Sequence, residues 1–286
     1  MKKKKFSVVD IIIASVLIIW GFAIFYPFYN SVLISFMTEA ELLKNPYAFY
    51  VKDVSFAAYK YIFSDGLIFT GYRNSLIMVL IGVPLSLIVT AALAYALSRK
   101  SFLLSKTINN LVVFTMYFGG GLVPTYLLIK NLGLMNSLWS VILPTVVTTY
   151  NMILIKSYFY STPDSLEESA KLDGANDVII FSKIYFPLAK PILASVGLFY
   201  TVSKWNDWYH PMLYLKSSMK WPVQLVLKEI ITDTATEVEE GGIMGEVFSN
   251  NIKMATIVAT MTPIMLVYPF LQKYFMKGIM IGAVKG

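Results

Sequence analysis

A polar and aromatic cluster interrupts the apolar run from Ile192 to Leu215 and offers the most obvious chemistry in the chain. Its members are Tyr200, Lys204, Trp205, Asn206, Asp207, Trp208, Tyr209 and His210. Aromatic faces beside amide and carboxylate groups suit sugars, whose C–H faces stack on rings while their hydroxyls need hydrogen-bond partners. The composition of the cluster therefore favours a path for a carbohydrate.

The depth of this cluster bears on the same question. In a helix that begins at Ile192, Lys204 lies about 18 Å along the axis, just past the middle of a hydrocarbon core about 30 Å thick. A charge at that depth needs a partner or water. Because Lys204 and Asp207 are three residues apart, we expect them to pair on one helix face. Pro211 frees the carbonyl of Asp207, so we expect a kink at this level.

Eight residues form the predicted substrate path, six from this cluster and two from the preceding apolar run. They are Tyr200, Lys204, Trp205, Asn206, Asp207, Trp208, Tyr150 and Asn151. Two alternatives stay open: the aromatics can be interfacial anchors with Lys204 and Asp207 as a structural pair, and Tyr150 and Asn151 can bond to neighbouring helices.

The second group with possible chemistry is a charged segment between two apolar runs. It comprises Glu167, Glu168, Ser169, Ala170, Lys171, Leu172, Asp173 and Gly174. Thr162 is a good N-cap, Pro163 fits the first helical position and Asp164 faces the positive end of the helix dipole. A short helix is therefore predicted from about Pro163, with Leu166 and Ala170 on one face.

The charged side chains of this short helix, Glu167, Glu168 and Lys171, are expected to be available to water. Gly174 can adopt the left-handed conformation that ends a helix. A second helical segment is predicted from Ala175 to about Tyr185, before two prolines interrupt it. The segment as a whole is predicted to form a helix–turn–helix elbow that meets another protein.

Composition shows which elements must carry these groups. The chain of 286 residues is 57% hydrophobic and only 14% charged, whereas soluble domains are about 45–50% apolar and 25% charged. This is typical of a membrane protein. The net charge of +7 comes without an aromatic-interleaved basic patch, which argues against nucleic-acid binding. The absence of cysteine excludes a disulfide framework, and with one histidine there is almost no set of metal ligands.

A helix that crosses a bilayer needs about 20 apolar residues. Six runs approach this length and predict an all-α membrane protein with six spans: 11–36, 75–97, 111–129, 138–155, 192–215 and 254–275. The third contains Gly119 to Gly121 and Pro124, and the fourth contains Pro144, so both are expected to be kinked or locally unwound. The chain 1–286 is predicted to be a single membrane domain.

Cations beside the spans predict the orientation. Placing the run from Lys2 to Lys5 inside, together with Arg99, Lys100 and the lysines of the charged segment, agrees with the positive-inside rule. Both the N-terminal tail 1–10 and the C-terminal tail 276–286 are then cytoplasmic. The first apolar run is too long for a cleaved signal peptide and lacks a small-x-small site, so it is predicted to be a retained helix.

Glu168-Ser169-Ala170, then Gly174, then Ile184 to Pro187 resembles the EAA loop of binding-protein-dependent ABC importer permeases. In that loop a Glu-Ala-Ala triplet precedes a Gly and an Ile-x-Leu-Pro run, and here Ser169 and Phe186 replace an Ala and the Leu. The segments 85–99, 188–208 and 268–286 also look like the carbohydrate-uptake branch of these permeases. The resemblance therefore covers most of the chain.

This resemblance implies a type I ABC importer permease fold, with the EAA loop at residues 160–190 as a cytoplasmic coupling helix between the fourth and fifth spans. It implies that Glu168 is the charged contact to an ATPase, that Ser169 and Ala170 allow close approach, and that Gly174 provides the turn. Glu167, Lys171 and Asp173 complete the ATPase-coupling set. A stiff, capped helix continuous with its neighbours is expected to act as the lever that ATP-driven closure moves.

The chain has no Gly-x-x-x-x-Gly-Lys-Ser/Thr phosphate loop and no soluble region large enough for a nucleotide-binding domain. The resemblance implies two partner ATPase subunits that bind ATP and Mg, a second and different permease subunit, and an extracytoplasmic solute-binding protein that delivers an oligosaccharide or related carbohydrate. The expected location is the cell membrane, and the chain itself is expected to bind no cofactor or metal and to catalyse no reaction.

Two other classes of function compete with this one. A secondary transporter would use Lys204, Asp207 and His210 as a proton or ion relay. A membrane enzyme would need a paired-carboxylate, Ser-His-Asp or metal constellation within the spans, and the sequence shows none.

Overall fold

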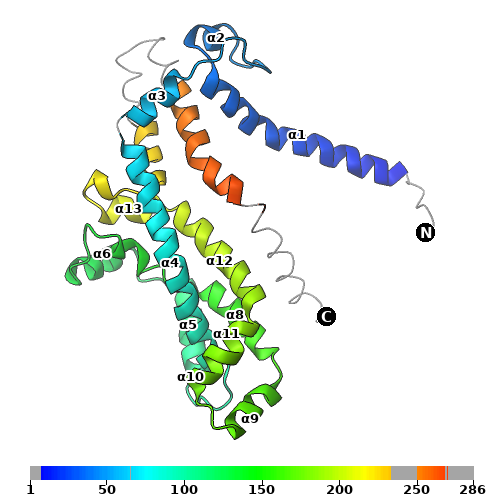
Figure 1. Ribbon diagram of the computed structural model, residues 1–286, viewed down its shortest axis with the longest axis vertical. Helices are drawn as coiled ribbons and strands as arrows, with labels where there is room; N and C mark the ends of the chain where they lie inside the picture. The colour runs from blue at the N-terminus through cyan, green and yellow to red at the C-terminus, as the bar shows by residue number, and fades with distance from the viewer. Residues whose placement is uncertain (1–7, 65, 233–249, 268, 270–286) are drawn as a thin grey trace. The chain divides into compact units, whose positions relative to one another are not determined.

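The computed structural model describes residues 8–64, 66–232, 250–267 and 269. Every regular element in those ranges is helical, as predicted (Figure 1). The chain divides into two compact units, Met1–Gly66 with Leu227–Thr262 and Leu67–Val226 with Pro263–Gly286. The expectation of one membrane domain stays a prediction.

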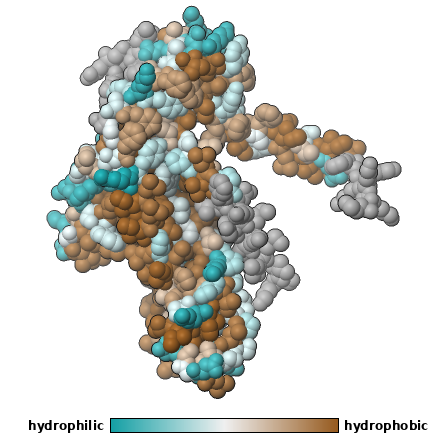
Figure 2. Space-filling view, viewed as in Figure 1, coloured by the Kyte–Doolittle hydropathy of each residue, from teal (hydrophilic) through white to brown (hydrophobic). Residues whose placement is uncertain are grey.

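The first unit contains a long apolar helix and a small folded loop. Its elements are α1 (Val8–Phe36), α2 (Glu39–Lys44), α3 (Ala57–Ser64) and the helical residues 227–232 and 250–262. The α1 helix is apolar around its whole circumference, and its surface is largely brown in Figure 2. A helix of that kind needs an apolar medium or partner.

The residues directly after α1 form a small hydrophobic core in the first unit. Met37, Leu42 and Ala48 are buried together, and the side-chain amide of Asn251 donates to the Met37 carbonyl at 2.8 Å. The Glu41 carboxylate accepts from the backbone N–H groups of residues 52 and 53 at 2.7 and 3.2 Å, which closes the loop after α2.

The second unit is built around α4 (Leu67–Ser98), which packs against both α8 and α12. Its other elements are α5 (Ser105–Tyr117), α6 (Leu122–Asn131), α7 (Trp139–Ile142), α8 (Thr149–Tyr160), α9 (Asp164–Leu172), α10 (Asp177–Ile180), the π-helix η1 (Phe181–Tyr185), α11 (Phe186–Leu188), α12 (Lys190–Trp205), α13 (Tyr209–Tyr214) and the 3₁₀ turn η2 (Ser218–Lys220).

Small residues let the partners approach α4 closely. A Cβ on Gly71 would lie 3.0 Å from the Val223 Cα, and one on Gly82 would lie 2.9 Å from the Lys204 side chain. Asn74 donates to two carbonyls of the segment 219–221 at 2.9 and 3.0 Å, and the hydroxyl of Ser75 accepts from the Val223 N–H at 2.9 Å. These contacts fix the segment after α13 to the first part of α4.

Two of the predicted spans are long continuous helices, α1 and α4, and both are long and apolar enough to cross a membrane. Two further spans result if each bent helix pair is counted as one: α5 with α6, bent by 114°, and Asp177–Leu188 with α12, bent by 80°. The helix after residue 249 is described as far as 267, so the rest of the sixth predicted span lies outside the described residues. The structure supports a multi-pass membrane protein, and the count of six stays a prediction.

The second segment of the elbow is close to its prediction of Ala175 to about Tyr185. It runs over Asp177–Leu188, capped by Asn176, and the helix breaks between Pro187 and Pro191 as expected.

Two local predictions were wrong. Thr162 does not cap α9: the helix begins at Asp164 after Pro163, and the Thr162 hydroxyl donates back to the Tyr158 carbonyl at 3.4 Å. The second error concerns the fifth span.

Lys204 and Asp207 do not pair in the structure. The α12 helix ends at Trp205 and a new helix starts at Tyr209, so the three-residue spacing no longer places the two side chains on one helix face. Lys204 donates to the Thr145 hydroxyl at 3.1 Å, and Asp207 pairs with His210 at 2.9 Å. The expected interruption near Pro211 is present, but it lies at residues 206–208.

Candidate functional site

The elbow that contains α9 is the first candidate site, and its own sequence explains its shape. Asp164 and Glu167 occupy the first turn and Lys171 the last, which complements the helix dipole. Gly174 has φ +80°, so it provides the predicted left-handed turn. The Ala175 N–H donates to the Ala170 carbonyl at 2.9 Å and the Gly174 N–H to the Lys171 carbonyl at 3.0 Å, the paired bonds of a Schellman motif.

Both connections of α9 are non-helical. Residues 161–163 separate it from α8, and residues 173–176 separate it from α10. The Asn176 side chain then starts the next helix by accepting from the Ile179 N–H at 2.9 Å. The α9 helix is therefore not continuous with its neighbours, and something other than the backbone must hold its direction.

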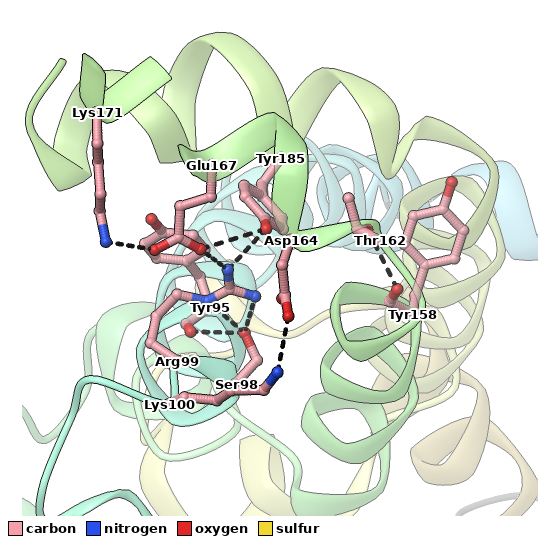
Figure 3. Close-up of polar contacts among 10 residues, drawn as sticks. All are labelled: Tyr95, Ser98, Arg99, Lys100, Tyr158, Thr162, Asp164, Glu167, Lys171 and Tyr185. Carbon is pink, nitrogen blue, oxygen red and sulfur yellow. Dashed lines mark hydrogen bonds and ion pairs between the residues drawn. The ribbon is translucent and has the colours of Figure 1, made fainter. Parts of the chain in front are cut away.

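Arg99, one residue beyond the end of α4, fixes the orientation of α9 through its side chain (Figure 3). Its guanidinium donates to the carboxylate of Glu167 and, at 2.7 Å, to the hydroxyl of Tyr185. It also donates to the Ser98 hydroxyl from Nε at 3.1 Å and from Nη2 at 2.8 Å. Tyr95 and Tyr185 present their ring faces to it, with centroids at 4.9 and 4.3 Å.

The pair of Arg99 and Glu167 is largely buried, with 9% and 14% of the two side chains exposed. On its other side Glu167 accepts from Lys171 at 2.6 Å. Burial acts to raise the pKa of Glu167, but the hydrogen bonds and charges of Lys171 and Arg99 outweigh it, so the pKa of this carboxyl is lowered. Glu167 is thus ionised and fixed, pointing from α9 toward α4.

A second ion pair lies beside the first and differs from it in exposure. Lys100 donates to Asp164 at 2.7 Å, with 80% and 61% of these side chains exposed. The hydrogen bond raises the pKa of Lys100 and lowers that of Asp164. A pair this exposed is screened by water and salt.

The outward side of the elbow carries different residues. Glu168 and Ser169 are exposed, while Ala170 is buried against the rest of the unit. Leu172 is 90% exposed, and Leu166 and Val178 are exposed as well. The helix therefore divides the predicted coupling set: Glu167 and Ala170 face the chain itself, whereas Glu168, Ser169, Lys171, Asp173 and Gly174 are exposed.

The predicted substrate-path residues are divided in the same way. Tyr200, Lys204, Trp205 and Asn151 are buried within the chain. The Tyr200 hydroxyl bonds to the Thr90 hydroxyl at 2.7 Å and accepts from the Thr148 N–H at 3.1 Å.

The other path residues reach the surface. Asn206, Trp208 and Tyr150 are exposed, and Asp207 is partly exposed and bound to His210. The structure does not bring the eight residues together at one surface.

Sequence reasoning missed two features of the unit. Arg99 was counted as an orientation cation, since nothing local indicates a partner 68 residues away. The break between α5 and α6 lies at the expected kink near Gly119 to Gly121, but the exposed aromatic side chains beside it, Phe114, Tyr117 and Phe118, were not singled out; the aromatic residues next to a triple glycine were the available signal. In the described parts of the chain, no group of three or more His, Asp or Glu side chains could hold a metal ion.

Comparisons with known proteins show clear relatives, although no family model matches the chain. The polygalacturonan/rhamnogalacturonan transport system permease protein YtcP of Bacillus subtilis is 39% identical over 289 residues, covering 100% of both chains. Protein LplC of Bacillus subtilis is 40% identical over 265 residues, covering 91% of this chain and 89% of the relative.

More distant matches agree with these two. The arabinooligosaccharides transport system permease protein AraQ of Halalkalibacterium halodurans is 28% identical over 297 residues, covering 100% of both chains. A crystal structure of a bacterial ABC transporter involved in the import of the acidic polysaccharide alginate matches with a TM-score of 0.86 at 32% identity. That match covers 96% of this chain and 100% of the other.

Proposed function

The chain belongs to the permease subunits of carbohydrate ABC importers, and from this premise we propose that it lines the membrane passage of an ATP-driven importer in which α9 is the coupling helix. Permease subunits of this kind are not themselves catalytic. A binding protein outside the membrane delivers the sugar, a second permease subunit completes the passage, and two ATPase subunits bind ATP and Mg. The secondary-transporter alternative finds no support among the relatives.

The exposed face of α9 is the observation that carries the coupling role. Glu168 and Leu172 project from a short helix whose opposite face is fixed to the chain through Glu167 and Ala170. With Leu166, Leu172 and Val178 all exposed beside charged side chains, the elbow offers apolar groups that another protein can cover while its charges stay at the rim. The site fits a groove on a separate cytoplasmic subunit.

Reconstitution tests this function directly. The chain, its partner permease, the ATPase and the binding protein are placed in vesicles, and uptake of labelled oligosaccharide is measured. Uptake that requires ATP and the binding protein and is indifferent to an ionophore supports the proposal. Uptake that follows a proton or ion gradient without ATP contradicts it.

The docking surface has its own test. We expect Glu168→Lys to reduce co-purification of the ATPase with the permease pair, because it reverses the charge at the centre of the exposed face. Lys100→Met is the matched control, since Lys100 is exposed but lies beside α4 rather than on α9. Equal ATPase recovery with both variants would remove Glu168 from the contact.

The six spans and the cytoplasmic termini also belong to the proposal. The chain has no cysteine, so single cysteines can be introduced without a background of native thiols. In vesicles prepared without the ATPase, Ser169→Cys on α9 should react with an impermeant thiol reagent only when the vesicles are inside-out, and Ser55→Cys only when they are right-side-out. Reaction of both from one side would contradict the proposed topology.

The sugar itself can be narrowed by its chemistry. Two of the matched proteins are named for galacturonans or alginate, which are polymers of sugar acids, and another is named for neutral arabinooligosaccharides. We favour an acidic oligosaccharide, because the sugar-acid match has the higher identity and full coverage. Uptake of an oligogalacturonate should exceed that of a neutral oligosaccharide of equal length, and the reverse order would reject this choice.

Among the predicted path residues, those at the surface are the better candidates for direct contact with the sugar. Tyr150, Asn206 and Trp208 are exposed, whereas Tyr200, Lys204, Trp205 and Asn151 are buried. Trp208→Ala and Asn206→Ala should raise the KM for uptake without reducing assembly. Wild-type kinetics in both variants would indicate that the sugar passes elsewhere.

A further inference from the structure

The way in which α9 is held raises the question of how its movement reaches the membrane-spanning helices. Its backbone leaves through Ser161–Pro163 on one side and through the left-handed turn at Gly174 on the other. Turns of this kind absorb rotation, because their few dihedral angles can change without breaking helical hydrogen bonds. A push on α9 is therefore poorly transmitted along the chain.

The side-chain connection from α9 to α4 is much stiffer. Arg99 donates to Glu167, to Tyr185 and twice to Ser98, and its guanidinium lies over the rings of two tyrosines. Arginine's planar fork is fixed by several hydrogen bonds at once, which lysine's single ammonium cannot reproduce. The pair is buried, so water competes little for either charge.

The π-helix η1 completes this connection from a third element. It spans Phe181–Tyr185, and its last residue, Tyr185, is fully buried with its hydroxyl on Arg99. Tyr185 also contacts the rings of Tyr95 and Phe159, with centroids 5.1 and 5.5 Å apart. π-Helical turns are rare and occur often at functional sites. Here the π-helical turn places the Tyr185 hydroxyl so that it accepts from the same Nη1 of Arg99 that donates to Glu167.

The α4 helix, to which Arg99 connects α9, is in contact with several other helices of the unit. In the second unit α4 packs against both α8 and α12, and its 32 residues make it long enough to cross a membrane. A displacement at the end of α4 thus acts on two neighbouring helices at once.

We propose that Arg99 is a positioning residue for transport, a strut that joins the coupling helix α9 to α4 through Glu167 and Tyr185 and carries ATP-driven movement into the membrane. This inference rests on the proposed function. The Lys100–Asp164 pair joins the same two parts of the chain but is exposed. Water and salt weaken it, so it transmits little of the movement of α9 to α4.

The test measures sugar taken up per ATP hydrolysed in reconstituted complexes, normalised to the amount of assembled complex. We expect Arg99→Met and Glu167→Gln each to lower this ratio about tenfold, within the range that perturbed coupling networks show, while ATP hydrolysis continues. Arg99→Lys should lie between wild type and Arg99→Met. Lys100→Met, the matched control, should stay within about twofold of wild type, as expected for an exposed ion pair.

A purely structural role predicts something else. If Arg99 only stabilises the fold, its loss reduces the amount of assembled complex and leaves the ratio of uptake to hydrolysis unchanged, which would overturn the proposal. An equal fall of the ratio in Lys100→Met would overturn it as well, because the strut would then not be specific.

A charge exchange covers the case in which Arg99→Met fails to assemble. Arg99→Glu with Glu167→Arg should recover part of the ratio that either single reversal loses, and no recovery would refute the strut. The wild-type complex separates the two levels of inference: without ATP-driven uptake the proposed function fails, whereas uptake with a ratio insensitive to Arg99 rejects the strut alone.

Discussion

Replacing Tyr200 with phenylalanine distinguishes a supporting role in the fold from contact with the sugar. The hydroxyl of this 2% exposed residue bonds to Thr90 at 2.7 Å and accepts from the Thr148 N–H at 3.1 Å. It therefore joins α12 to α4 and to the break before α8. The substitution removes one oxygen atom and both bonds while keeping the ring.

The size of the effect follows from those two bonds. Hydrogen bonds between membrane helices average about 0.6 kcal/mol, so two give about 1.2 kcal/mol, and the cost rises toward about 3 kcal/mol if the freed N–H finds no other partner. A loss of about 1.2 kcal/mol corresponds to a fall of about 2–5 °C in Tm when a unit of about 150–250 residues unfolds, and to a smaller fall when a larger assembly unfolds as one.

The assay is thermal denaturation of the purified complex in detergent, together with the KM for sugar uptake. We expect Tyr200→Phe to lower Tm and leave KM unchanged. Tyr150→Phe is the matched control, because Tyr150 is 55% exposed and should leave Tm unchanged. An unchanged Tm with a raised KM for Tyr200→Phe would refute this reasoning and return Tyr200 to the sugar path.

Three further predictions concern backbone space and charge. Gly71→Ala should destabilise the second unit in thermal denaturation, because its Cβ would lie 3.0 Å from the backbone of Val223. An unchanged Tm would show that the backbone around Val223 moves away at no cost. Gly174→Ala should cost about 1–2 kcal/mol, the penalty of a left-handed residue with a Cβ, and unaltered chemical denaturation would contradict it. Because folding lowers the pKa of Glu167 from its ordinary value of 4.5, the stabilisation it contributes is complete above that value and is lost as the pH falls through the lower pKa of the folded state. Glu167→Gln should therefore flatten the loss of stability in acid, and a pH profile identical to wild type would exclude that contribution.

Local patterns were enough to predict the elements whose causes are local. The apolar runs 11–36 and 75–97 correspond to α1 and α4, since length and hydropathy alone decide such helices. Gly174 was predicted as the left-handed end of the elbow helix for the same reason, because only a residue without a Cβ adopts that conformation at no cost.

The largest errors occur where residues distant in sequence take part. The spacing of Lys204 and Asp207 was correct for a continuous helix, but the helix ends between them and each finds a partner elsewhere. Glu167 looked water-facing because its helix is polar, and its inward orientation depends on Arg99, far away in sequence. Helical periodicity gives the direction of a side chain relative to its helix, and it carries no information on which other element lies there.

The π-turn Phe181–Tyr185 leaves the residues before it out of α-helical phase with those after it. The turn fits one more residue than an α-turn into nearly the same rotation, so deleting a single amino acid other than Tyr185 within it would let an ordinary α-helix form with both flanks near their present orientation. A deletion among the α-helical residues of α12 would instead rotate everything beyond it by about 100°. The loss of one residue should consequently be tolerated within this turn and not in the helix that follows.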